Sequence, residues 1–70
     1  MDTATILIVM GSRIKSIRMK QGISQKELAD ECHFEKASMS RIESGQTNTS
    51  ILTLEKIPIA LNVHITNFLA

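Results

Sequence analysis

The chain has 70 residues, a formal net charge of +1 and a single cysteine, Cys32. A chain of this length can bury only one modest core, and a helical bundle is the simplest way to build one. With aromatic residues at only 3%, that core must be largely aliphatic. One cysteine excludes an internal disulfide, so we expect Cys32 to be buried filler in a protein of the reducing cytoplasm. The small net charge does not by itself indicate a nucleic-acid partner.

The first ten residues form an apolar segment ahead of the first predicted helix. The run Ile6–Met10 is too short to span a membrane, and Asp2 lies where a secretion signal would carry positive charge, so no membrane association is expected. The β-branched residues of this run favour an extended arm or the first turn of the following helix, packed on the body or on a second subunit. We predict an N-terminal arm at residues 1–10 and one domain at residues 11–70.

Apolar spacing predicts a first helix over about residues 11–21. Ile14 and Ile17 would face the core, and Gly22 would follow the helix end in the left-handed conformation that glycine tolerates. Every charged residue from position 13 to position 26 is basic, whereas residues 57–70 carry no formal side-chain charge. This asymmetry suits a protein that meets a polyanion with one surface and a partner subunit with another; a solvated basic helix is the alternative.

Residues 24–45 carry the most informative pattern, because apolar residues keep helical spacing on both sides of one short break. Ser24 and Glu27 have the spacing of a capping box, in which each side chain bonds a backbone N–H that the helix start would leave unpaired. The pattern predicts one helix over about residues 25–31 and a second over about residues 36–44. Together they have the form of a helix-turn-helix.

The corner between these two helices follows from the residue types around it. Ala29 is small, so the helices can cross closely, and His33 stands where the chain needs an unusual backbone angle. Met39 and Ile42 are three residues apart and therefore face the core together. Gly45 ends the second helix.

A loop then leads to a fourth helix, for which Ser50 is a suitable N-terminal cap and Asn62 a suitable left-handed C-terminal residue. Pro58 lies well inside this helix, where it removes a hydrogen bond. We expect a kink rather than a break into two pieces, because the apolar pattern continues beyond it. A last short helix is predicted around residues 65–69. The apolar stripe of the fourth helix consists of Leu54, Ile57 and Leu61.

Two charged residues are predicted to lie on core-facing sides of their helices. Arg18 follows Ile14 by four residues, and Glu43 follows Met39 by four. A buried guanidinium and a buried carboxylate are each costly alone, but a bidentate pair offsets much of that cost and fixes the first helix against the third. We therefore expect an Arg18–Glu43 ion pair; the alternative is that both side chains reach solvent.

The side of the third helix opposite its core residues carries short and cationic side chains. Arginine or lysine can donate to guanine O6 and N7 in the major groove, and a small residue leaves room for a thymine methyl group. Lys36 and Arg41 are thus expected to contact bases, with Ala37 and Ser38 beside them; an ordinary charged surface helix is the alternative. The candidate DNA-facing residues of this helix are Lys36, Ala37, Ser38, Ser40, Arg41 and Ser44.

Phosphate contacts are expected from two other places and would set register rather than sequence. Gln25 combines a side-chain amide with free backbone N–H groups and the positive end of the second helix. Thr47 and Asn48, which follow the third helix, would form a second clamp on the same strand.

From Gly11 to about Phe68 the sequence resembles the lambda-repressor-like helix-turn-helix family, the XRE or Cro/cI type, in the segments RIKSIRMKQGISQKELAD, SMSRIESG and LTLEKIPIALNV. The resemblance implies an all-α fold of five helices, a helix-turn-helix formed by the second and third, and binding of double-stranded DNA as a homodimer. It also implies the ion pair between the first and third helices and a phosphate contact by Gln25. His33 replaces the usual corner glycine and Pro58 a good helix former, and neither lies on the DNA-facing side.

Catalytic and metal-binding patterns are not evident. His33 and His64 lie far apart, with no Cys, Asp or Glu at metal-ligand spacing, and there is no nucleophile motif or glycine-rich phosphate loop. We therefore expect no enzyme activity, no cofactor and no metal.

Two functions remain. The first is a sequence-specific transcription regulator, a repressor or autoregulator that binds a palindromic operator as a homodimer. The run Ile6–Met10 and the apolar residues Val63, Ile65, Phe68 and Leu69 exceed what one small core readily hides, which favours self-association. The second is a protein-interaction module on the same fold, such as an antitoxin-like partner protein, which the modest net charge favours.

Overall fold

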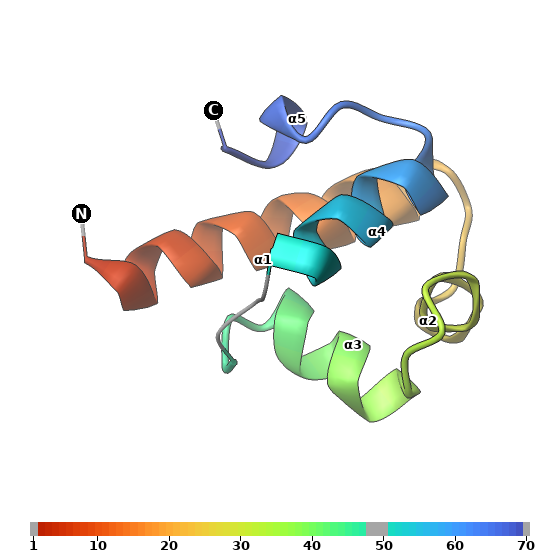
Figure 1. Ribbon diagram of the computed structural model, residues 1–70, viewed down its shortest axis with the longest axis horizontal. Coiled ribbons are helices and arrows are strands. Elements are labelled where there is room, and N and C mark those ends of the chain that lie inside the picture. The colour runs from red at the N-terminus through yellow and green to blue at the C-terminus, as the bar shows by residue number, and fades with distance from the viewer. Residues whose placement is uncertain (1, 48–50, 70) are drawn as a thin grey trace.

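This computed structural model describes residues 2–47 and 51–69, which contain five helices and no strand (Figure 1). In chain order they are α1 (Thr3–Lys20), α2 (Gln25–Glu31), α3 (Lys36–Glu43), α4 (Ile51–Leu61) and α5 (Thr66–Leu69). The longest helix, α1, contacts α3, α4 and α5, while α2 packs on α3 and α4. The expected all-α fold of five helices is therefore confirmed.

α1 begins at Thr3, so the predicted helix start near Gly11 is wrong. Asp2 caps the helix, because its side chain accepts a hydrogen bond from the backbone N–H of Thr5 at 2.8 Å. β-Branched residues cost a helix only roughly half a kcal/mol each, and packing outweighs that cost here. Met10 is buried, and Gly45, which follows α3, lies against the backbone of Ile8. Residues 3–10 are thus helical turns rather than an extended arm.

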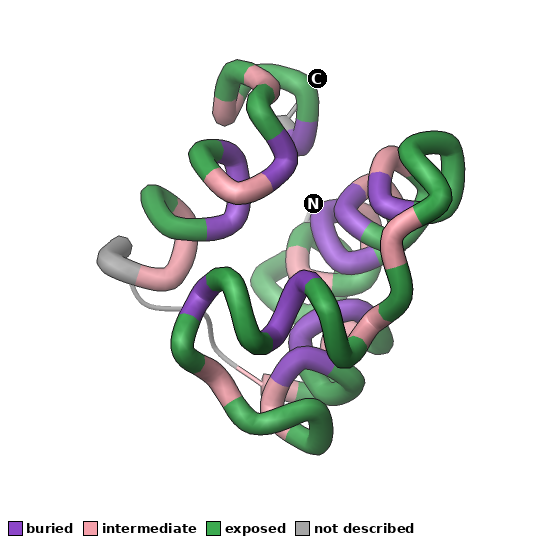
Figure 2. The backbone as a smooth tube through the Cα atoms, turned by 90° about the vertical axis from the view of Figure 1, so that its right-hand side faces the viewer, coloured by how far each residue is buried: buried purple, intermediate pink, exposed green. Residues whose placement is uncertain are grey.

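The core lies between α1 and the helices that pack on it, and Figure 2 shows the buried residues facing one another across the bundle. It is aliphatic except for Phe68 of α5, whose side chain is fully buried. Cys32 is 1% exposed, and burial raises the pKa of its thiol, as expected of apolar filler. The buried hydrophobic residues are Met10, Ile14, Leu28, Ala29, Cys32, Met39, Ile42, Ile57, Leu61 and Phe68.

Among the described residues, Gly22 and Asn62 have the left-handed backbone predicted for them, His33 has the unusual angle expected at the corner, and Gly45, predicted only to end its helix, is also left-handed. Gly22 and Gly45 follow α1 and α3 with φ of 69° and 74°. His33 forms the α2–α3 corner with φ of 58°, and Asn62 ends α4 with φ of 57°. Histidine and asparagine are among the non-glycine residues that adopt this conformation most readily, so the corner forms without glycine.

α4 runs without interruption through Pro58, so the alternative of two separate helical pieces is wrong. Pro58 is itself buried, as are Ile57 and Leu61 of the predicted apolar stripe, and this burial offsets the lost backbone hydrogen bond. The kink stays a prediction. The predicted cap at Ser50 lies outside the described residues.

The close crossing of α1 and α3 depends on Gly11. A Cβ atom on Gly11 would clash with the carbonyl oxygen of Ile42 and lie 2.5 Å from that of Glu43. We expect Gly11→Ala to push the helices apart and to lower the free energy of unfolding by about 1–3 kcal/mol, as measured by urea denaturation. Ser12→Ala, at the exposed neighbouring position, should leave that free energy unchanged or slightly higher, because alanine favours helix. Equal stability of the two variants would contradict the claim that the close approach of α1 and α3 requires glycine at position 11.

Candidate nucleic-acid interface

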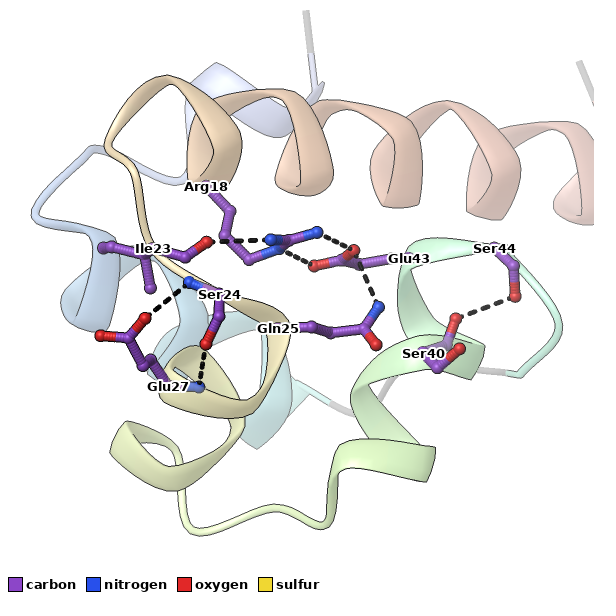
Figure 3. Close-up of polar contacts among 8 residues, drawn as sticks. All are labelled: Arg18, Ile23, Ser24, Gln25, Glu27, Ser40, Glu43 and Ser44. Atoms are coloured by element: carbon purple, nitrogen blue, oxygen red, sulfur yellow. Dashed lines mark hydrogen bonds and ion pairs between the residues drawn. The ribbon is translucent and has the colours of Figure 1, made fainter.

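Arg18 of α1 and Glu43 of α3 form a buried ion pair behind the candidate interface (Figure 3). Arg18 Nε donates to Glu43 Oε2 at 2.7 Å, and Nη2 donates to Oε1 at 3.0 Å. The two side chains are 10% and 3% exposed. Hydrogen bonding to Glu43 raises the pKa of Arg18 above its usual value. This is the bidentate contact that the helical spacing predicts, and it ties α1 to α3.

The start of α2 is fixed from two sides. Arg18 Nη1 donates to the carbonyl oxygen of Ile23 at 2.9 Å, which holds the residue before the helix cap. The predicted capping box is present: Ser24 Oγ accepts from the backbone N–H of Glu27 at 3.0 Å, and Glu27 Oε1 accepts from that of Ser24 at 2.9 Å. Bonding to the backbone of Ser24 lowers the pKa of Glu27. The first turn of α2, which carries Gln25, is thereby held in place.

The Gln25 side chain points toward α3 and contacts the ion pair (Figure 3). Its Nε2 donates to Glu43 Oε1 at 3.1 Å, so this oxygen accepts from both Arg18 and Gln25. Sequence reasoning placed Gln25 at the interface but missed this contact. Gln25 and Glu43 are 18 residues apart on different helices, and no local pattern indicates that they meet.

α3 turns Met39 and Ile42 into the core and its opposite face to solvent, as predicted. Its two cations, Lys36 and Arg41, make no ion pair within the described part of the chain. Ser44 Oγ donates to the carbonyl oxygen of Ser40 at 3.0 Å, so the hydroxyl proton of Ser44 is already hydrogen-bonded to the backbone of α3. The exposed residues of this face are Lys36, Ala37, Ser40, Arg41 and Ser44, and Ser38 beside them is half-buried.

The second predicted clamp is described only in part. Thr47 is half-buried in the segment after α3, and Asn48 lies outside the described residues. Lys26, which stands next to Gln25, pairs with Asp30 on the same helix at 2.9 Å. That exposed pair raises the pKa of Lys26 and leaves less free charge at the start of α2 than the basic run of the sequence suggests.

The sequence analysis did not predict that Lys15 lies close to Gln25. A depression of about 140 Å³ lies among α1, α2 and α3, beside the Gln25 amide. Lys15 is exposed and makes no ion pair in residues 2–47 or 51–69, so its ammonium group and the Gln25 amide border the depression together with the Glu43 carboxylate that Arg18 neutralises. Lys15 precedes Arg18 by three residues, and this spacing on one helix face was the available signal. The depression is lined by Lys15, Gln25, Ser40, Glu43 and Ser44.

Other kinds of site are not found in the described residues. They include no group of three or more His, Cys, Asp or Glu side chains that could hold a metal ion. No described helix combines the length and the hydropathy needed to cross a membrane.

A family model described as helix-turn-helix matches residues 14–68. The chain is 39% identical over 62 residues to the control protein C.BamHI of Bacillus amyloliquefaciens, and the match covers 87% of this chain and 76% of that protein. It is 41% identical over 58 residues to the HTH-type transcriptional regulator SinR of Bacillus subtilis (strain 168). That match covers 81% of this chain and 52% of SinR, so the chain spans about half the length of this relative.

The fold agrees with these sequence relationships. The crystal structure of SinR in complex with DNA matches with a TM-score of 0.79 and 40% identity, over 87% of this chain and 98% of that one. The family match includes α2, α3 and the ion pair behind them. The chain therefore belongs to the lambda-repressor-like helix-turn-helix family.

Proposed function

We propose that this chain is a transcription regulator that binds double-stranded DNA with α3 in the major groove. The observation that carries the proposal is the exposed face of α3, where Lys36 and Arg41 make no ion pair in the described residues and the helix is braced from behind by the Arg18–Glu43 pair. A rigid helix with free cations can present donors to base edges without first breaking internal contacts. The family is one of transcription regulators rather than enzymes, and SinR has been crystallised with DNA.

The residues divide into two roles. Lys36 and Arg41 would contact guanines, with small residues next to them leaving room for base edges. Gln25 and the residues after α3 would hold the phosphate backbone and set the position of α3 on the duplex. The proposed DNA contacts are Gln25, Lys36, Ala37, Ser38, Ser40, Arg41, Thr47 and Asn48.

We further propose that the chain acts as a homodimer, as a repressor or autoregulator in the cytoplasm. Ile6 and Ile8 of α1 are 42% and 55% exposed, and the uncharged first turns of α1 belong to the same helix that packs on the uncharged α5. A second copy would cover this apolar surface without bringing like charges together. Two copies of α3 would then enter successive major grooves about 34 Å apart, so the operator would be palindromic.

Selection of bound sites from a random duplex pool tests the function, the symmetry and the spacing together. We expect two inverted half-sites about 10 base pairs apart. Affinity for the selected site should fall steeply as salt rises, with a log–log slope of about −0.9 for each phosphate contacted, because bound cations release counterions.

A properly folded chain that binds no duplex at low salt would contradict this function. It would favour a protein-interaction module instead, for which Ile59, 79% exposed on α4, offers an apolar contact.

A further inference from the structure

The Glu43 carboxylate serves the interface as well as the core. Its Oε2 accepts from Arg18 Nε, and its Oε1 accepts from Arg18 Nη2 and from Gln25 Nε2. Glu43 is almost fully buried, while Gln25 is half-buried. Gln25 and Lys15 both line the depression among α1, α2 and α3. The Glu43 carboxylate thus bonds both to Arg18 in the core and to Gln25 at the proposed DNA surface (Figure 3).

This contact determines which groups Gln25 can offer to a phosphate. A free glutamine side chain samples many rotamers, and ordering it on binding costs free energy. Bonding to Glu43 fixes the Gln25 amide before DNA arrives, with one N–H used by Glu43 and the second N–H still available as a donor. Arg18 contributes twice, because it fixes the Glu43 carboxylate and also holds the Ile23 carbonyl just ahead of α2.

We propose that Glu43, itself held by Arg18, is a positioning residue for Gln25, so that the buried pair sets DNA affinity as well as helix packing. The inference rests on the proposed function and on a phosphate contact by Gln25. A charge-assisted bond to Glu43 orients the amide more strongly than a bond between neutral groups would. Freeing Gln25 from Glu43 should therefore weaken DNA binding even when the fold is intact.

A double-mutant cycle on DNA affinity separates positioning from packing. Gln25→Ala should weaken operator binding about tenfold in the wild-type background, the effect of removing one charge-assisted hydrogen bond. The background variant carries Arg18→Met and Glu43→Leu, because apolar replacement of a buried pair usually preserves stability. In that background Gln25→Ala should weaken binding by less than about twofold, since the amide is no longer held. A purely structural role of Glu43 would alter the folded fraction but not the effect of Gln25→Ala.

Three outcomes would overturn this inference, the proposed function, or both. An equal penalty for Gln25→Ala in both backgrounds overturns the positioning role and leaves the proposed function intact. No penalty in the wild type overturns the Gln25 phosphate contact and this inference with it, while DNA binding stands. A wild-type chain that binds no duplex overturns the proposed function and this inference together.

A measurement on the unmodified chain covers the case in which the background variant fails to fold. NMR order parameters of side-chain amides compare three glutamines in one sample. Gln21 Nε2 donates to the Leu61 carbonyl oxygen at 2.7 Å and is the hydrogen-bonded reference, whereas Gln46 is exposed and is the reference expected to be mobile. We expect the Gln25 order parameter to lie close to that of Gln21, well above about 0.6. A Gln25 amide as mobile as that of Gln46 overturns the inference.

Discussion

Replacing Glu43 by alanine is expected to lower the free energy of unfolding by about 3–5 kcal/mol. The substitution leaves the Arg18 guanidinium buried with no counter-charge and removes the acceptor of two of its hydrogen bonds. It also removes the partner of Gln25, so α2 is no longer bonded to α3 at this point. Because small native domains are stable by only about 5–15 kcal/mol, this variant would lose a large part of its stability.

Urea denaturation followed by far-UV circular dichroism measures this loss. Glu55→Ala removes an exposed carboxylate from α4 and should change the free energy of unfolding by no more than about 0.5 kcal/mol. The double variant R18M/E43L should stay within about 1.5 kcal/mol of the wild type, because it removes both buried charges together. If Glu43→Ala were as stable as Glu55→Ala, the ion pair would not be what holds α1 on α3.

The sequence predicts best those features that depend on residues close together in the chain. The capping box at Ser24 and the left-handed residues His33 and Asn62 follow from local backbone chemistry, and the structure contains them. The Arg18–Glu43 contact is long-range, but helical periodicity places each of the two charges on a core-facing side of its helix. Because the charges are opposite, an ion pair between them can then be predicted. All of these features lie within residues 14–68, the part of the chain that the family model matches.

Features that depend on how the helices cross could not be predicted in this way. The local pattern of the apolar run at the start of α1 fits an arm or a helix, and packing against Gly45, which follows α3, favours the helix. Gln25 meets Glu43, and Lys15 borders the same depression, only because α1, α2 and α3 converge there. The sequence therefore indicates which residues lie on the exposed side of α3 more readily than it indicates which side chains from different helices meet.

The double variant K36A/R41A is expected to lose most of the preference for the selected operator over unrelated duplex. Both side chains are exposed on α3 and free of ion pairs in the part of the chain that is described, so their removal should leave the fold unchanged. A bidentate contact to a base contributes about 1–3 kcal/mol of discrimination, so removing two should reduce the affinity ratio about a hundredfold or more. Competition binding at two salt concentrations measures that ratio.

The matched control is K15A/K20A, which removes the same charge from exposed positions of α1. Lys15 borders the depression beside Gln25, so this variant should bind every duplex more weakly and with a smaller salt slope, by about 0.9 for each phosphate that is no longer neutralised. Its operator preference should match that of the wild type, because phosphates carry no base information. If K36A/R41A behaved like K15A/K20A, α3 would be a charged surface and not the element that reads bases. A contrast between the two variants would separate base reading on α3 from phosphate attraction on α1.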